Sequence, residues 1–222
     1  MSFAKIAIFI QLFIYYGYIF CHFICSIHPK PLLLSLYTNP LNLPTIMLVK
    51  TYSAAVNGLD VTTVRVEVNI VPGVMYHLTG LGDTAVREGR DRIASALQFN
   101  GYKFPHADIT VNLAPADLRK EGSSFDLPLA MAILTASGAV TADNIGDYML
   151  VGELSLDGTL QPVKGALPIA IRARAEKFKG LIVPKQNERE AAVVNNLEVY
   201  GMNNIMDVIK LITGAAEYEP TF

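Results

Sequence analysis

The sequence predicts an α/β fold with a mixed sheet and flanking helices. Some stretches, such as residues 61–70, alternate apolar and polar side chains with the period of a half-buried strand. Others, such as residues 83–101, repeat apolar residues with the period of a helix. These two kinds of stretch are interspersed along the chain, and 222 residues are enough to bury a sizeable core.

The first predicted elements are two strands and a helix. A Val-Pro-Gly turn separates residues 61–70 from residues 73–81, which predicts two neighbouring antiparallel strands. The helix over residues 83–101 starts at Asp83, a suitable N-cap, and stops at an Asn-Gly pair. A Gly-x-Gly-x-x-Ala pattern precedes it, but the acidic residue that a dinucleotide site needs about 20 positions later is missing. We therefore interpret this loop as a tight turn with an N-cap.

The second half contains further helices and strands. The stretch "KEGSSFDLPLAMAIL" predicts a helix from about Ser124 to Ser137. Residues 148–163 predict a β-hairpin whose turn is Asp157-Gly158. The other predicted elements are a strand at 108–114, a helix at 166–178, a strand at 180–184, a short helix at 187–194, a strand at 197–201 and a helix near 205–214.

The composition excludes several classes of site. Lys and Arg number 18 and Asp and Glu number 20, so any nucleic-acid contact must be a local patch. The two cysteines, Cys21 and Cys25, lie in one apolar run without zinc-ligand spacing. No GxxxxGK[ST] loop occurs, and neither His77 nor His106 has a partner at metal-ligand spacing. The sequence therefore predicts no cofactor or metal in this chain.

Residues 1–46 form an apolar leader whose composition differs from the rest. They contain no Asp or Glu, and residues 6–27 are an uncharged run of the length that spans a bilayer. Met47 then begins a normally patterned domain. We favour translation from a wrongly chosen start, which predicts a cytoplasmic protein. The alternative is a membrane anchor through residues 6–27.

The serines at positions 123 and 124 pose the main functional question. A serine nucleophile needs a base nearby, and the sequence offers Lys120, Lys164, Lys177 and Lys179. A serine that caps a helix contributes about 1 kcal/mol and is common. From the residues alone, we interpret the serine as a helix cap.

Two long segments carry a resemblance to a known family: "VNLAPADLRKEGSSFDLPLAMAIL" and "LVGELSLDGTLQPVKGALPIAIRARAEKFKGLIVPKQNEREAAVV". With "VKTYSAAVNGLD" and "GLGDTAVREGRDRI", they make residues 47–214 resemble the N-terminal domain of the ComM/YifB magnesium-chelatase-like AAA+ family. That domain is similar to the proteolytic domain of Lon, which implies a left-handed βαβ crossover against the general preference. Residues 215–222 would then begin a linker to an ATPase module that this chain lacks.

The resemblance to Lon implies where a catalytic dyad would lie. Lon's nucleophile motif, laid on "KEGSSFD", falls on Ser124, and its general-base motif, laid on "GELSLDGTLQPVKGAL", falls on Leu167. The dyad is therefore broken. Lys164 comes three residues earlier, near one helical turn away if the helix already runs there. Phe125 and Asp126 would place bulk and a charge in the peptide cleft, so Ser124 is expected to be a vestigial nucleophile position that caps the helix.

Complete members of the family are implied to be hexameric, ATP- and magnesium-dependent DNA branch-migration helicases in recombination and natural transformation. We therefore expect a truncated or standalone, non-catalytic N-terminal domain that acts in assembly or DNA guidance. DNA and further copies of the chain are the expected partners, with Arg119 and Lys120 as candidate DNA contacts, and a membrane only if the leader is real. The alternatives are a Lon-like peptidase that uses Ser124 and Lys164, and a magnesium-chelatase-type ATPase subunit.

Overall fold

The computed structural model describes residues 48–58 and 60–221. The predicted leader and its candidate membrane span at residues 6–27 lie outside the described residues. Within the described part, none of the helices has the length and apolar character needed to cross a membrane.

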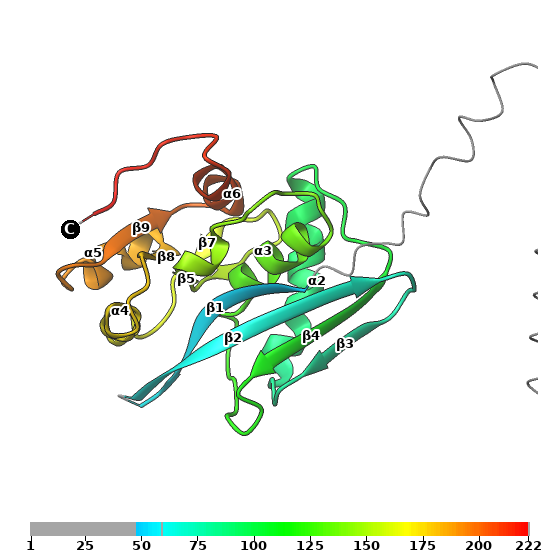
Figure 1. The fold of residues 1–222 in the computed structure, drawn as a ribbon, viewed down its shortest axis with the longest axis horizontal. Helices are drawn as coiled ribbons and strands as arrows, with labels where there is room; N and C mark the ends of the chain where they lie inside the picture. The colour runs from blue at the N-terminus through cyan, green and yellow to red at the C-terminus, as the bar shows by residue number, and fades with distance from the viewer. Residues whose placement is uncertain (1–47, 59, 222) are drawn as a thin grey trace, which may run out of the picture. The chain divides into compact units, whose positions relative to one another are not determined.

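A seven-stranded mixed sheet runs through the described part in the order β3-β4-β2-β1-β5-β8-β9 (Figure 1). The pairs β1-β2 and β2-β4 are antiparallel, and the other four neighbouring pairs are parallel. The strands are β1 (Val49–Asn57), β2 (Asp60–Val71), β3 (Tyr76–Thr79), β4 (Asp108–Ala114), β5 (Tyr148–Leu150), β8 (Gly180–Pro184) and β9 (Glu198–Met202). The helices are α2 (Thr84–Phe99), α3 (Asp126–Ala136), α4 (Ala166–Ala175), α5 (Glu188–Ala191) and α6 (Ile205–Thr213), with 3-10 turns at Ile145–Asp147 and Lys185–Asn187.

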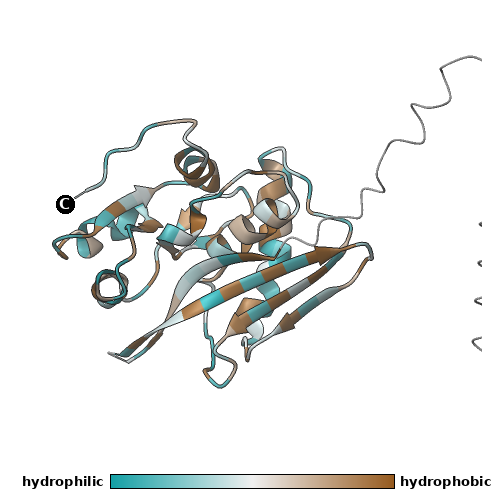
Figure 2. Cartoon of the chain, viewed as in Figure 1, coloured by the Kyte–Doolittle hydropathy of each residue, from teal (hydrophilic) through white to brown (hydrophobic). Residues whose placement is uncertain are grey.

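Alternation along β2 places one side of the strand in the core. Val64, Val66 and Val68 are fully buried, and Figure 2 shows the matching bands of hydrophobic and hydrophilic residues. On the neighbouring β4, Val111 and Leu113 lie opposite Val68 and Val66 and are also fully buried. The period of two therefore specifies both the buried face and the register of these strands.

The prediction that residues 61–70 and 73–81 form neighbouring antiparallel strands is wrong. β4 lies between β2 and β3, and β3 is parallel to β4. The reason lies in Asp108, whose carboxylate accepts hydrogen bonds from the N–H groups of Val74 and Met75 at 2.5 and 2.6 Å. These bonds hold the connection after β2 against the start of β4, so the chain continues on the far side of β4.

The expected left-handed crossover lies between β3 and β4. Helix α2 connects these two adjacent parallel strands and lies behind this part of the sheet in Figure 1. With both strands running in the same direction, this placement makes the βαβ unit left-handed. The predicted N-cap of α2 is confirmed, because the Asp83 carboxylate accepts from the Val86 N–H at 2.9 Å.

Helix α3 forms the centre of the larger core. All its residues from Asp126 to Thr135 are buried, as a helix that is apolar nearly all round requires. It packs against β1, β2 and α2. A second cluster of buried residues joins β5 and β8 to α4 and α5 through side chains such as Met149, Leu181 and Ile169.

Residues 148–163 do not form one hairpin as predicted. β5 belongs to the large sheet, where it lies between β1 and β8. Only β6 (Glu153–Leu154) and β7 (Leu160–Gln161) form a hairpin, and the predicted turn at Asp157-Gly158 is confirmed by the bond from the Gly158 N–H to the Ser155 carbonyl at 2.9 Å.

Candidate functional site

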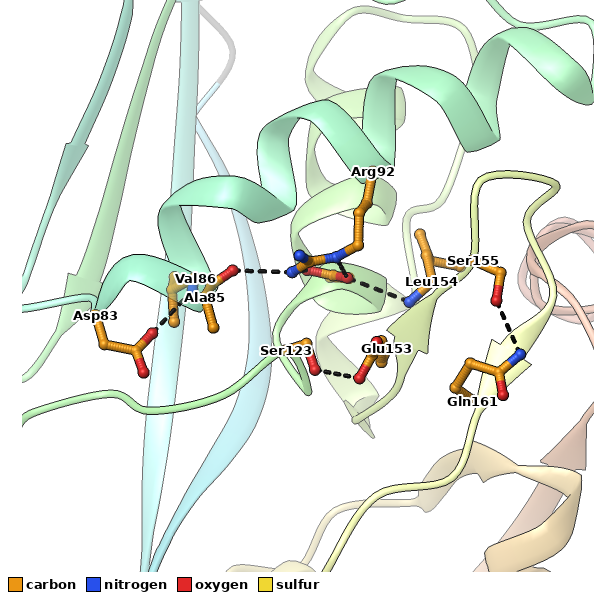
Figure 3. A network of polar contacts seen from close by, with 10 residues as sticks. Asp83, Ala85, Val86, Arg92, Ser123, Glu153, Leu154, Ser155 and Gln161 are labelled. Carbon is orange, nitrogen blue, oxygen red and sulfur yellow. Dashed lines mark hydrogen bonds and ion pairs between the residues drawn. The ribbon is translucent and has the colours of Figure 1, made fainter.

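The two serines lie in the loop between β4 and α3, beside the start of β6. The Ser123 hydroxyl donates a hydrogen bond to the Glu153 carboxylate, and Figure 3 shows these two side chains facing each other. The Ser124 carbonyl accepts a hydrogen bond from the Gly152 N–H at 2.9 Å. Within residues 48–58 and 60–221, the Ser124 hydroxyl has no hydrogen-bond partner. The loop is therefore fixed through Ser123 and the backbone, and not through the Ser124 side chain.

The prediction that Ser124 caps α3 is wrong. The N-cap residue is Phe125, and no side chain accepts a hydrogen bond from the first turn. The Asp126 and Leu127 N–H groups already donate to backbone carbonyls at 3.1 and 3.0 Å, and Pro128 has no N–H. A serine cap would therefore find no unsatisfied N–H at the usual positions.

A buried ion pair joins Asp126 on α3 to Arg92 on α2, and Figure 3 shows Arg92 in one view with Ser123 and Glu153. Nε and Nη2 of Arg92 donate to the two carboxylate oxygens of Asp126 at 2.7 and 3.0 Å, and the Leu154 N–H donates to the same carboxylate at 3.2 Å. The Asp126 side chain is 0% exposed and that of Arg92 is 21% exposed. Burial raises the pKa of the Asp126 carboxyl while Arg92 opposes this rise, and the Asp126 carboxylate raises the pKa of Arg92. This geometry is a bidentate, charge-assisted clamp between two helices.

The glycine at position 89 makes room for this clamp. A Cβ at Gly89 would lie 2.5 Å from Oδ1 of Asp126. Glycine inside a helix is less favourable than alanine by about 1 kcal/mol, but any side chain here would displace the carboxylate from Arg92.

Phe125 and Asp126 were expected to lie in a peptide cleft, but both side chains are directed into the interior. Phe125 is fully buried in the larger core cluster, and the Asp126 carboxylate faces Arg92. The bulk and the charge that follow Ser124 therefore stabilise the interior, and they do not obstruct a surface groove.

The position expected for a catalytic base lies in the first turn of α4. The Leu167 side chain packs against the second core cluster, and its N–H donates to the Glu190 carboxylate at 3.1 Å. Lys164 is exposed and precedes the helix, because Gly165 is the N-cap in a left-handed conformation with φ of 78°. The predicted start of this helix at residue 166 is confirmed, so the condition under which Lys164 would lie within the helix, one turn from the base position, is not met. In the described part of the chain, no hydrogen bond links a lysine to Ser124.

Comparisons with known proteins agree with this architecture. A family model described as subunit ChlI of Mg-chelatase matches residues 66–187, more than half of the chain. Competence protein ComM of Haemophilus influenzae is 40% identical over 164 residues, which cover 73% of this chain and 32% of that protein. The chain belongs to the magnesium-chelatase-like ComM/YifB family.

Other relatives of this ComM/YifB chain include two kinds of protein. The uncharacterized protein YifB of Escherichia coli is 44% identical over 145 residues, 65% of this chain and 28% of that protein. Lon protease 2 of Thermus thermophilus is 31% identical over 135 residues, 57% of this chain and 16% of that protein. The chain thus spans about a third of the length of the ComM and YifB relatives that it matches.

The two candidate DNA contacts have different environments. Lys120 is fully buried and its ammonium donates to the Pro115 carbonyl, so the expectation of a surface cation is corrected. Burial lowers the pKa of Lys120, and Asp117 opposes this effect. Arg119 is exposed, with Nε 3.0 Å from Oε1 of Glu121. A DNA contact through Arg119 stays a prediction, whereas Lys120 holds its own loop together.

Among the residues that the structure describes, no three His, Cys, Asp or Glu side chains gather where they could hold a metal ion. His77 on β3 and His106 in the loop before β4 are both exposed. Two acidic residues of this region, Glu153 and Asp126, are engaged with Ser123 and Arg92, respectively.

Arg92, Gly89 and Glu153 are parts of this site that were not predicted from the sequence. Two signals were available. A single Asp in an otherwise apolar helix needs a charged or hydrogen-bonding partner when it is buried, and a glycine inside a helical pattern often marks a close approach. Neither signal identifies which of the arginines on α2 is the partner, because that depends on how the helices pack.

Proposed function

We propose that this chain is the non-catalytic N-terminal domain of a ComM-type AAA+ protein, a cytoplasmic DNA branch-migration helicase in recombination and natural transformation. In this proposal the domain serves assembly or DNA guidance, and a hexamer is the working form. ATP and magnesium act in the part of such proteins that this chain does not span. The Haemophilus influenzae relative is named a competence protein, which supports the role in transformation.

The single observation that carries the non-catalytic part of this proposal is that a leucine, Leu167, stands at the position expected for the general base. Leu167 has no titratable group, and its backbone N–H is bound by Glu190. A serine hydroxyl at its ordinary pKa is a poor nucleophile without a nearby base. Ser124 therefore keeps the place of a nucleophile but lacks the means of activation, which favours a binding role for the domain.

DNA affinity measured against salt tests the binding part. The full chain would be titrated into fluorescein-labelled DNA, and its association constant followed by anisotropy as the salt concentration rises. A contact between Arg119 and a phosphate predicts that Arg119→Ala weakens binding and reduces the salt slope by about one. Arg189→Ala is the matched control, because Arg189 is an exposed arginine on α5. Absence of binding at low salt would contradict DNA guidance.

A second candidate function is a Ser-dependent peptidase. The similarity to Lon protease 2 and the serine retained at position 124 favour it. In that case Lys164 would have to act as the base from outside the helix, where its exposed ammonium has ordinary solvation. Cleavage of an unfolded protein, lost on Ser124→Ala and on Lys164→Ala, would support the peptidase and contradict our proposal.

A further inference from the structure

A cavity of about 360 Å³ opens between the segment that enters β3, helix α2 and the loop of residues 102–107. This is within the range of small-ligand sites, about 300 to 1,000 Å³. Its described lining contains no Asp or Glu. The side chains with distinctive chemistry are Arg90, Lys103, His106, Tyr76, Tyr102 and Phe104.

Arg90 is held in place by aromatic rings. Its Cζ lies 5.6 Å from the ring centre of Tyr76 and 5.7 Å from that of Phe104, which are cation-π distances. Its only ion pair within the described residues is with Asp91, at 3.2 Å, and the Asp91 side chain is 83% exposed. Such surface pairs contribute little and exchange readily. The rings therefore hold the guanidinium, and the Arg90 side chain is 47% exposed, which leaves it available to another anion.

We infer that this cavity binds single-stranded nucleic acid, with an unstacked base on its aromatic wall and a backbone phosphate at Arg90 and Lys103. This inference rests on the proposed function and gives its DNA-guidance part a location. Cations that follow the backbone, beside rings on which bases stack, are the two components of sequence-independent single-strand binding. The chain carries a net charge of −2, so a local cationic patch of this kind is required for phosphate binding.

The aromatic content decides between nucleic acid and an acidic peptide. Carboxylates would pair with Arg90 and Lys103, but they offer no flat surface to Tyr102 or Phe104. A base has such a surface on both faces, whatever its identity. Bases within a duplex are covered by their neighbours, so the cavity should prefer single strands over duplexes.

The test is the affinity of the full chain for a short labelled oligo(dT), measured by anisotropy for matched pairs of variants. Arg90→Gln is compared with Arg189→Gln, an exposed arginine on α5, and Phe104→Ala with Phe99→Ala. Phe99 is 73% exposed and does not line the cavity. Lys103→Gln adds a variant of an exposed side chain, which keeps the test decisive if the half-buried Phe104 is needed for folding.

Loss of one stacked base predicts binding about five- to a hundred-fold weaker for Phe104→Ala. Arg90→Gln and Lys103→Gln should each weaken binding several-fold, while the two control variants stay within about twofold of the wild type. If oligo(dT) binds and the cavity variants bind as well as the controls, this location is wrong and the proposed function stands. If neither single-stranded nor duplex DNA binds, DNA guidance and this inference fail together. Displacement of oligo(dT) by poly-glutamate at equal charge concentration would identify an acidic peptide as the occupant and overturn the inference.

Discussion

Replacing Arg92 with alanine should destabilise the fold strongly. The change removes the bonds of 2.7 and 3.0 Å to Asp126 and leaves its carboxylate with one N–H at 3.2 Å, although the side chain is 0% exposed. Breaking a buried ion pair in this way costs about 3 to 5 kcal/mol. Because Arg92 is 21% exposed and water can reach the vacated space, we expect about 3 kcal/mol, a large part of the about 5 to 15 kcal/mol of a whole domain.

Urea unfolding followed by circular dichroism measures this loss as a change in midpoint at constant slope. Arg87→Ala is the control, since Arg87 is an exposed arginine on the same helix, and it should change the free energy of unfolding by less than about 1 kcal/mol. The double variant Arg92→Met with Asp126→Leu should recover most of the loss, because an apolar pair needs no compensation of charge.

The loss should also depend on pH. Burial raises the pKa of Asp126, and without Arg92 this pKa should rise further above the unfolded value of about 3.9. Below that value the carboxyl is protonated in both states and the cost is absent. The cost grows as the pH rises from the unfolded pKa to the folded pKa and is complete above it, so the deficit of Arg92→Ala should be larger at about pH 7 than at about pH 4. A loss below about 1 kcal/mol at neutral pH, or an equal loss at both pH values, would refute the reasoning.

Three further predictions use the same unfolding assay. Burial lowers the pKa of Lys120, so its charged form costs stability at neutral pH. The wild type should therefore gain stability relative to Lys120→Met as the pH rises toward the unfolded lysine pKa of about 10.4. Parallel pH profiles of the two proteins would contradict this. Asp83→Ala should cost about 1 kcal/mol, because the Asp83 carboxylate accepts hydrogen bonds from two backbone N–H groups at 2.9 and 3.1 Å. Ser124→Ala should change the free energy of unfolding by less than about 0.5 kcal/mol. Equal losses for the two variants would restore Ser124 as a helix cap. Gly89→Ala should lower the midpoint despite the better helix propensity of alanine, since the new Cβ would meet the Asp126 carboxylate at 2.5 Å; a higher midpoint would show that the clamp tolerates displacement.

Local patterns predicted several elements well. The strand at residues 180–184 has the bounds that its apolar run indicates, and Asp83 caps α2 as its position before the helical pattern suggests. The strand β1 was not recognised, and β3 was placed beside the wrong neighbour. The second error concerns which strands pair over long distances, and periodicity contains no information on that choice. The first has another cause, because the buried face of β1 includes the polar residues Thr51 and Ser53.

In the candidate site, too, the sequence did not predict contacts between residues that are distant along the chain. Motif comparison placed Ser124 and Leu167 at the two positions of a Lon-type dyad, but it could not show what the surrounding side chains do. Lys120 is three residues before Ser123 along the chain, yet its ammonium turns inward to a carbonyl of its own loop. Arg92 is more than thirty residues from Asp126 and is nevertheless its partner. Whether a charged side chain is buried, and which residue it pairs with, depends on tertiary packing. The charge of a residue in the sequence therefore did not show whether that residue lies on the surface.

The most direct test of the central claim is labelling of the full chain with a serine-reactive fluorophosphonate probe. If Ser124 keeps a nucleophile's position without a base, as we propose, the wild type and Ser124→Ala should show the same background labelling under native conditions, as should Lys164→Ala. A Lon-type protease domain with its Ser-Lys dyad intact serves as the positive control. Labelling of the wild type that Ser124→Ala abolishes would show an activated serine and contradict the account of a non-catalytic domain.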